Sequence, residues 1–178
     1  MSIDALRHDC AVKQKKGLHF IMASVVIWAA VLAIHLTGLP MDTKNLLTFC
    51  CACPLVPLAF LISKWIHVDF QGKDNPLTKA GLLFSINQIL YILIAMWVMN
   101  AVPAKMLMVY TMIFGAHLMP YSWLYNSRSY MVLSVAIPIA ALIVGLIAEP
   151  WILALMMFCV EIAFSFCLVM EVKKLSNS

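Results

Sequence analysis

A single acidic residue, Glu161, lies well inside the last long apolar stretch of this 178-residue chain. It comes about ten positions into a predicted membrane helix that begins near Trp151. A carboxylate at such a depth is costly unless it is paired, protonated or in contact with water. Glu161 therefore has two readings that the sequence leaves open. It is either a binding site for a proton or cation, or a protonated carboxyl that holds neighbouring helices together.

Other polar residues are predicted to lie near the same depth. At a rise of about 1.5 Å per residue, Glu161 lies about 15 Å from the outer end of its helix, and the other candidates lie roughly 20 Å from theirs. Tyr121 lies further towards the cytoplasm, on the face that carries His117. Because polar groups in lipid need partners, we expect one intramembrane site made of Glu161, His117, Asn87, Gln88, Ser165 and Tyr121.

The roles in this predicted site follow from the chemistry of the side chains. Glu161 would exchange a proton or hold a cation, and His117 would share the proton or bind a solute. The amides of Asn87 and Gln88 would supply neutral hydrogen bonds.

The cysteines suggest an alternative site. Cys50 and Cys53 are one helical turn apart in the run Cys50-Cys-Ala-Cys-Pro54, and Cys159 is predicted at a depth near that of Cys53. Such a set can act as a redox dithiol or bind a soft metal. Cysteine is also a small residue that packs well in apolar surroundings, and this structural interpretation is the one we favour.

Signatures of common membrane enzymes are missing from the sequence. There is no Gly-x-Ser-x-Gly, no His-Glu-x-x-His and no Gly-rich phosphate loop. No two predicted intramembrane histidines share a level, which argues against haem ligation. We therefore predict no cofactor, and we favour a protein that is not an enzyme.

The elements that must position these residues follow from composition. The chain is 64% hydrophobic and 11% charged, with a mean hydropathy of +0.96, whereas soluble domains are about 45–50% apolar and about 25% charged. The net charge of +4 comes without a basic run containing aromatics, so nucleic acid is not an expected partner. The expected surroundings are a lipid bilayer.

A bilayer core needs roughly 20 apolar residues per helix, and six segments meet this need. They form one all-α transmembrane domain, residues 17–174, between an interfacial N-terminal helix in residues 1–16 and a tail at 175–178. Prolines 54, 57, 120 and 138 predict kinks in three of the helices. The predicted segments are 17–39, 44–66, 79–101, 103–125, 129–148 and 151–172.

The distribution of Lys and Arg predicts the orientation of this six-helix bundle. The N-terminal segment, the connection at 64–79, the turn at 126–129 and the C-terminal tail hold ten of these residues, including Lys73, and the other three turns hold only Lys44 and Lys105. Since positive residues stay in the cytoplasm, both termini are predicted to be cytoplasmic.

Two further patterns concern symmetry and assembly. Residues 57–62 (PLAFLI) resemble residues 138–143 (PIAALI), which would relate two halves of three helices as an inverted repeat. Ala141-x-x-x-Gly145 is a small-residue pattern that allows close helix packing. A homo-oligomer is therefore among the expected partners.

Three segments resemble a family of small bacterial membrane proteins of unknown function: Lys44-Asn-Leu-Leu-Thr-Phe-Cys-Cys-Ala-Cys-Pro54, Asp69-Phe-Gln-Gly-Lys-Asp-Asn-Pro76 and Met112-Ile-Phe-Gly-Ala-His-Leu-Met-Pro-Tyr121. The resemblance covers nearly the whole chain. It implies a bacterial multi-helix protein of the inner membrane, but it supplies no activity and no catalytic residue.

Three classes of function remain from the sequence. The leading hypothesis is a small transporter or channel-like protein for a solute or ion, coupled to protons through Glu161 and His117. The second is a membrane redox or metal-binding enzyme that uses Cys50 and Cys53. The third is a non-catalytic assembly or sensor protein.

Overall fold

Helices account for all the regular structure in the part of the chain that the computed structural model describes, residues 2–69 and 75–176. This confirms the predicted all-α class. The α-helices are α1 (Ile3–Lys13), α2 (Leu18–His35), α3 (Met41–Ala52), α4 (Leu55–Trp65), α5 (Leu77–Ala101), α6 (Met106–Ala116), α7 (Met119–Leu124), α8 (Arg128–Ile147) and α9 (Pro150–Ser176). Two 3-10 turns, η1 (Lys15–Gly17) and η2 (Pro103–Lys105), connect some of them.

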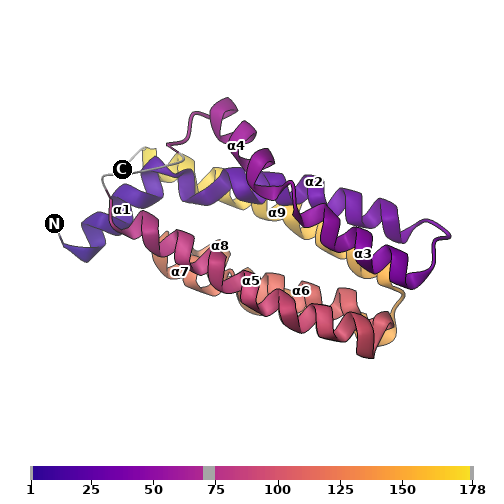
Figure 1. Cartoon of the computed structure of the whole chain (residues 1–178). Helices are drawn as coiled ribbons and strands as arrows, with labels where there is room; N and C mark the ends of the chain where they lie inside the picture. Colours follow the sequence, from indigo (N-terminus) through magenta and orange to yellow (C-terminus); the bar gives the residue numbers. More distant parts are fainter. Residues whose placement is uncertain (1, 70–74, 177–178) are drawn as a thin grey trace.

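The helices form two layers (Figure 1). In one layer α2 packs along α9, and α3 and α4 lie against α2. In the other layer α6 packs along α8, α5 lies against α6, and α7 lies against α8. Trp28 of α2 joins the layers, because its ring meets that of Phe114 of α6 edge-on with centroids 5.7 Å apart. Trp28 is 1% exposed, and Phe164 and Met157 of α9 are fully buried.

One end of the bundle carries both termini, and we call it the terminal end (Figure 1). Lys16, before α2, pairs with Glu171 near the end of α9. The backbone carbonyl of Ile66, after α4, accepts from Lys15, and Asn75, before α5, donates to the carbonyl of Leu6 in α1. These contacts show that α2 and α5 begin at the terminal end and that α4 and α9 finish there.

The opposite end is held by three lysine and asparagine contacts. Lys44 in α3 donates to the carbonyl of His35 at the end of α2. Asn45 donates to the carbonyl of Pro103 over 2.9 Å, and Lys105 donates to the carbonyl of Gly145 over 2.7 Å. The chain therefore runs back and forth between the two ends.

Most of the described Lys and Arg residues lie at the terminal end, as their positions in the sequence predict. Lys44 and Lys105 lie at the opposite end. Lys73 lies outside the described residues. The other basic residues belong to segments at the terminal end, namely Arg7, Lys13, Lys15, Lys16, Lys64, Lys79, Arg128, Lys173 and Lys174.

Four helices are individually long and apolar enough to cross a membrane: Lys15–His35, Leu77–Ala101, Arg128–Ile147 and Pro150–Leu175. The pair α3 and α4 adds a fifth candidate if it is a single span with a bend of 40°. The predicted segment 103–125 is divided into α6 and α7, which have 11 and 6 residues. The structure thus supports four or five candidate spans, and the predicted count of six is not confirmed.

Prolines explain where two of the helices break. Pro120 has no N–H with which to bond the carbonyl of Ala116, and α6 ends at Ala116. A tighter turn follows, in which the Leu118 N–H donates to the carbonyl of Gly115. Pro54 likewise lies between α3 and α4. Pro138, by contrast, lies inside a continuous α8, so the third predicted kink does not interrupt its helix.

The small residues of α8 are used inside the chain. Ala141 is fully buried, and a Cβ added to Gly145 would overlap the side chain of Met108 in α6. The Ala141-x-x-x-Gly145 face therefore packs against α6. The predicted inverted repeat is not confirmed either, because Pro57 lies in the short α4 and Pro138 lies in the 20-residue α8.

The N-terminal segment forms a helix, as expected, and it is docked on the bundle. Cys10 and Ala11 of α1 are buried. Asn75 donates both to the carbonyl of Leu6 and to the carboxylate of Asp9 over 2.9 Å. At the other terminus α9 continues to Ser176, beyond the predicted end near residue 172. Residues 177–178 of the predicted tail lie outside the described residues.

Candidate functional site

Glu161 is fully buried where α9 packs along α2. The structure joins its Oε2 to the hydroxyl of Ser24 in the middle of α2. The same hydroxyl lies 2.7 Å from the backbone carbonyl of Ile21, to which it donates. The Glu161 carboxyl, the Ser24 hydroxyl and the Ile21 carbonyl thus form one hydrogen-bonded row across the two helices.

The hydrogen bonds of the Ser24 hydroxyl indicate the protonation state of the Glu161 carboxyl. A serine hydroxyl has one proton to donate and two lone pairs that accept. If Ser24 donates to Ile21, it can only accept from Glu161, and the carboxyl must then carry the proton. If Glu161 is ionised, Ser24 must turn its proton towards Oε2 and leave the carbonyl of Ile21. Ser24 therefore keeps both of its hydrogen bonds only when Glu161 is neutral, and neutrality also avoids the cost of burying a charge.

Two buried oxygens beside this hydrogen-bonded row have no hydrogen-bond partner among the described residues. They are Oε1 of Glu161 and Oγ of Ser165. Residues four apart share one face of a helix, so both oxygens lie on the same face of α9. Buried polar atoms in native proteins are nearly always paired, and an exception points to water, an ion or a functional role.

His117 lies at the break between α6 and α7, as the C-terminal cap of α6. Its Nδ1 is hydrogen bonded to the carbonyl of Phe114. Its ring meets the rings of Phe114 and Tyr121 edge-on, with centroids 5.2 Å and 6.0 Å away. The broken helix is what frees this carbonyl and gives His117 a backbone partner.

Tyr121 connects this region to α5. Its hydroxyl lies 2.6 Å from the hydroxyl of Ser85 and donates to the carbonyl of Gly81 over 3.0 Å. The structure therefore brings His117 and Tyr121 together and adds Ser85 to them.

The predicted site is divided between the two layers. Glu161 and Ser165 belong to the α2–α9 pair, and His117 and Tyr121 belong to α6, α7 and α5. In the described part of the chain, no hydrogen bond or ion pair joins Glu161 to His117. Two aromatic rings lie between Tyr121 and Glu161. The Tyr130 ring is 6.1 Å from that of Tyr121 and 4.8 Å from that of Phe164, which is one turn beyond Glu161.

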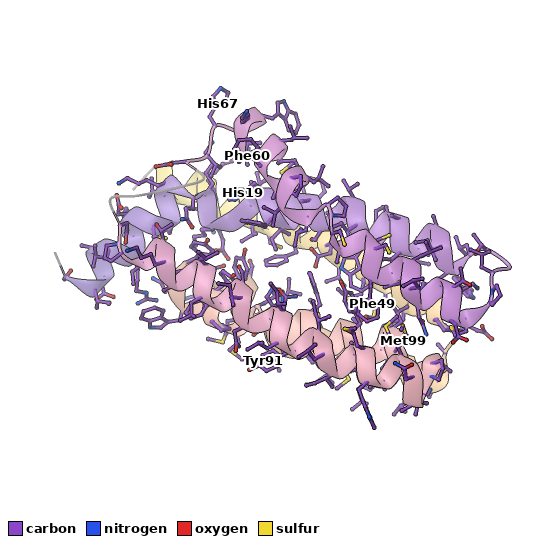
Figure 2. All side chains as sticks on the ribbon, in the orientation of Figure 1. His19, Phe49, Phe60, His67, Tyr91 and Met99 are labelled. Carbon is purple, nitrogen blue, oxygen red and sulfur yellow. The ribbon has the colours of Figure 1, made fainter. Side chains whose placement is uncertain are left out.

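The two predicted amides are not part of either group. Asn87 is exposed on α5, and Gln88 is half-buried. Neither side chain has a hydrogen bond to a described residue. Figure 2 shows the neighbouring Tyr91 on the side of α5 that faces away from α2 and α9.

The alternative cysteine site has exposed members. Cys50, Cys53 and Cys159 are free and exposed. The thiol of Cys53 points back to the carbonyl of Phe49, 3.9 Å away. Over residues 2–69 and 75–176, no group of three or more His, Cys, Asp or Glu side chains is arranged to hold a metal ion.

A cavity of about 260 Å³ lies at the terminal end. Residues from α1 form one wall, and Glu161 is not among the lining residues. The lining combines the apolar residues Ala11 and Leu175 with polar residues that include Arg7, Lys16 and Asn126.

Sequence reasoning missed Ser24 and Ser85, which turn out to be the hydroxyl partners of Glu161 and Tyr121. A usable signal existed for Ser24, because it is the sole hydroxyl residue in the first predicted membrane helix before Thr37. Polar groups in lipid need partners, so a lone serine and a lone glutamate in two apolar helices are natural candidates for one another.

The fold and the site together define an all-α protein whose long apolar helices suggest embedding in a membrane, with a buried carboxyl between two of them. The chain belongs to a family of unknown function (DUF7010), whose profile matches residues 3–171. No curated protein matches the chain significantly, and no solved structure does.

Proposed function

We propose that this protein spans a bacterial inner membrane with six crossing segments and both termini in the cytoplasm. The alternation of contacts between the terminal end and the opposite end supports an even number of crossings. The excess of basic residues at the terminal end supports its cytoplasmic location. In this topology α3 with α4, and α6 with α7, are crossings broken by prolines.

Cysteine labelling tests this topology. Gly38→Cys lies at the opposite end and Arg128→Cys lies at the terminal end, in a background without the six native cysteines. In intact cells, a membrane-impermeant maleimide should label position 38 and should reach position 128 only after permeabilisation. Labelling of both positions, or the reverse pattern, would refute the proposed orientation.

We further propose that the protein is a proton-coupled carrier for a small solute or ion, in which the Glu161 carboxyl binds and releases the proton. The observation that supports this proposal is the pair of buried, unpartnered oxygens on Glu161 and Ser165. If the carboxyl only stabilised the packing of α2 on α9, both of its oxygens should be hydrogen bonded, because an unsatisfied polar group in an apolar layer is costly.

Ser24 can hydrogen bond to the Glu161 carboxyl in both of its protonation states. With the proton on Glu161, the Ser24 hydroxyl accepts a hydrogen bond from the carboxyl and donates to the carbonyl of Ile21. After release of the proton, Ser24 rotates its hydroxyl and donates to the carboxylate instead. In the carrier, His117 and Tyr121 in the other layer contact the solute, and the rings of Tyr130 and Phe164 separate them from Glu161.

Infrared spectroscopy tests the exchange without knowledge of the solute. The protonated carboxyl band that Glu161→Gln removes should be present at neutral pH in lipid-reconstituted protein, and it should shift within minutes of transfer to D2O. Glu149→Gln, which changes an exposed carboxyl between α8 and α9, is the matched control and should leave that band in place. A band that persists unshifted would show a sealed structural carboxyl and overturn the proposal.

Proton uptake into liposomes provides the functional measurement. Protein with Glu149→Gln should take up protons at the wild-type rate under an imposed membrane potential, and protein with Glu161→Gln should be at the rate of empty liposomes. Equal uptake by wild type and Glu161→Gln would remove Glu161 from any proton pathway.

A further inference from the structure

Helix α5 is the most exposed of the candidate spans, with only 11% of its apolar window buried inside the chain. Its inward face meets α6 and α7 and includes Gly81, Ser85 and Ala95. Much of its remaining surface is exposed, including Leu83, Leu90 and Ile94. In a membrane such a face contacts either lipid or another protein.

Asn87 distinguishes these two possibilities. It lies about 15 Å from one end of α5 and about 21 Å from the other, which places it near the middle of a span. It is exposed, and its amide forms no hydrogen bond with a described residue. A carboxamide facing hydrocarbon tails at this depth would leave two N–H donors and one carbonyl unsatisfied. The exposed position therefore calls for a polar partner from outside the chain.

The residues around Asn87 form a regular seam. Positions separated alternately by four and three residues lie in one line on a helix that pairs with another. Along α5 this line carries large apolar residues on either side of a single asparagine. We name it the Asn87 seam, and its exposed members are Leu83, Asn87, Leu90, Ile94 and Trp97.

We propose that the Asn87 seam is the surface on which a second copy of this chain docks. Two copies inserted in the same orientation are related by a two-fold axis along the membrane normal, and the interface is then self-complementary. Their α5 helices run parallel, so each Asn87 meets the other at the same depth. An amide both donates and accepts, and two such groups can bond each other across the axis.

A single asparagine in an otherwise apolar seam also sets the register and the number of helices that associate. Any shift of one helix along the other would return both amides to hydrocarbon. The seam thus favours one dimer over other pairings of the same apolar surface. This inference requires α5 to lie in the bilayer, but it does not depend on proton binding at Glu161.

The dimer can be measured by energy transfer between labelled copies in liposomes of increasing lipid content. Asn87→Val should weaken association about tenfold, whereas Asn87→Gln should largely preserve it. Asn100→Val is the matched control, since Asn100 is exposed on the same helix but donates to the carbonyl of Met96. Wild-type protein that stays monomeric, or a dimer that Asn87→Val leaves unchanged, would overturn the proposal.

Cross-linking locates the seam independently of its strength. In a cysteine-free background, Leu90→Cys should form a disulfide between copies under mild oxidation, and Ile89→Cys should not. The two residues are 59% and 61% exposed, so their access to the oxidant is matched. Equal cross-linking at both positions, or cross-linking at position 89 alone, would place the interface elsewhere and refute the Asn87 seam.

Discussion

Lys16 Nζ lies 2.6 Å from Glu171 Oε2, and this ion pair joins the η1 turn to the last turns of α9. Lys16 is 5% exposed. The second carboxylate oxygen of Glu171 accepts from the N–H and the hydroxyl of Ser129, at 3.0 Å and 2.6 Å. One carboxylate thus ties α2 to α9 and also caps the first turn of α8, where negative charge is favourable.

Removing one member of this pair should be costly. Lys16→Met leaves the Glu171 carboxylate without its cation, and we expect it to lower the free energy of unfolding by about 3 kcal/mol. Glu171→Gln should have a similar effect. The double variant should be more stable than the sum of the two losses predicts, by at least about 1 kcal/mol. Unfolding in mixed micelles with increasing SDS measures all four proteins, and strict additivity would show that the two side chains do not interact.

Gly115 should not tolerate a side chain. A Cβ at this position would lie 2.6 Å from Cδ of Pro138 and 2.8 Å from Cβ of Ile137, and neither atom belongs to a flexible side-chain end. We expect Gly115→Ala to force α6 away from α8 and to cost about 1–3 kcal/mol. Gly38→Ala is the control, because nothing lies within 4 Å of its added Cβ. A thermal unfolding midpoint for Gly115→Ala equal to that of Gly38→Ala would contradict this packing.

The docking of α1 should weaken in acid. Hydrogen bonds from Asn75 and Lys13 lower the pKa of Asp9 below its ordinary value of 3.8. A lowered pKa in the folded state means that the carboxylate contributes stability above the unfolded-state value, and that this contribution is lost as the pH falls through the folded-state value. Hydrogen exchange of the α1 amides should therefore accelerate as the pH falls below about 3.8, after correction for intrinsic rates.

Asp9→Asn provides the comparison for this acid effect. It should show faster α1 exchange already at neutral pH and no further acceleration in acid. Asp4→Asn changes an exposed carboxylate of the same helix, whose side chain is 82% exposed, and should retain the wild-type pH profile. Identical profiles for wild type and Asp9→Asn would exclude Asp9 as the responsible group.

Cys10 should resist alkylation although it lies outside the membrane-spanning helices. Burial raises the pKa of its thiol from 9.0 to about 11. The reactive thiolate is therefore roughly 100-fold scarcer near pH 8 than in an ordinary cysteine. Val12→Cys, at a 45% exposed position of α1, gives the reference rate in a background without other cysteines. Equal iodoacetamide rates at positions 10 and 12 would show that α1 is not docked as the structure has it.

Much of the fold follows from local features of the sequence. Pro120 and Pro54 mark real breaks because a missing N–H acts within its own helix turn. The length of the apolar stretches locates α2, α5, α8 and α9 to within a few residues. Pro138 shows the limit of such reasoning, because α8 continues through it without a break.

The pairing of polar groups was harder to predict. Depth along each helix placed Glu161 and His117 at similar levels, but depth does not determine which helices are neighbours. Helix α2 is apolar on all sides, so periodicity gives no direction to its faces. The partnership of Ser24 with Glu161 therefore depends on the antiparallel register of α2 and α9, which is defined by contacts between the two extremes of the chain.

That register has a consequence for the order of synthesis. Ser24 and Lys16 belong to the first candidate span that leaves the ribosome, and their carboxyl partners, Glu161 and Glu171, belong to the last. Until translation is nearly finished, a nascent chain holds Lys16 without its anionic partner and Ser24 bonded only within its own helix, since domains otherwise fold from the N-terminus as they emerge. A chain truncated before α9 should leave the Lys16 ammonium without its ion pair, and membrane proteases would then have a means to tell an incomplete copy from a finished one.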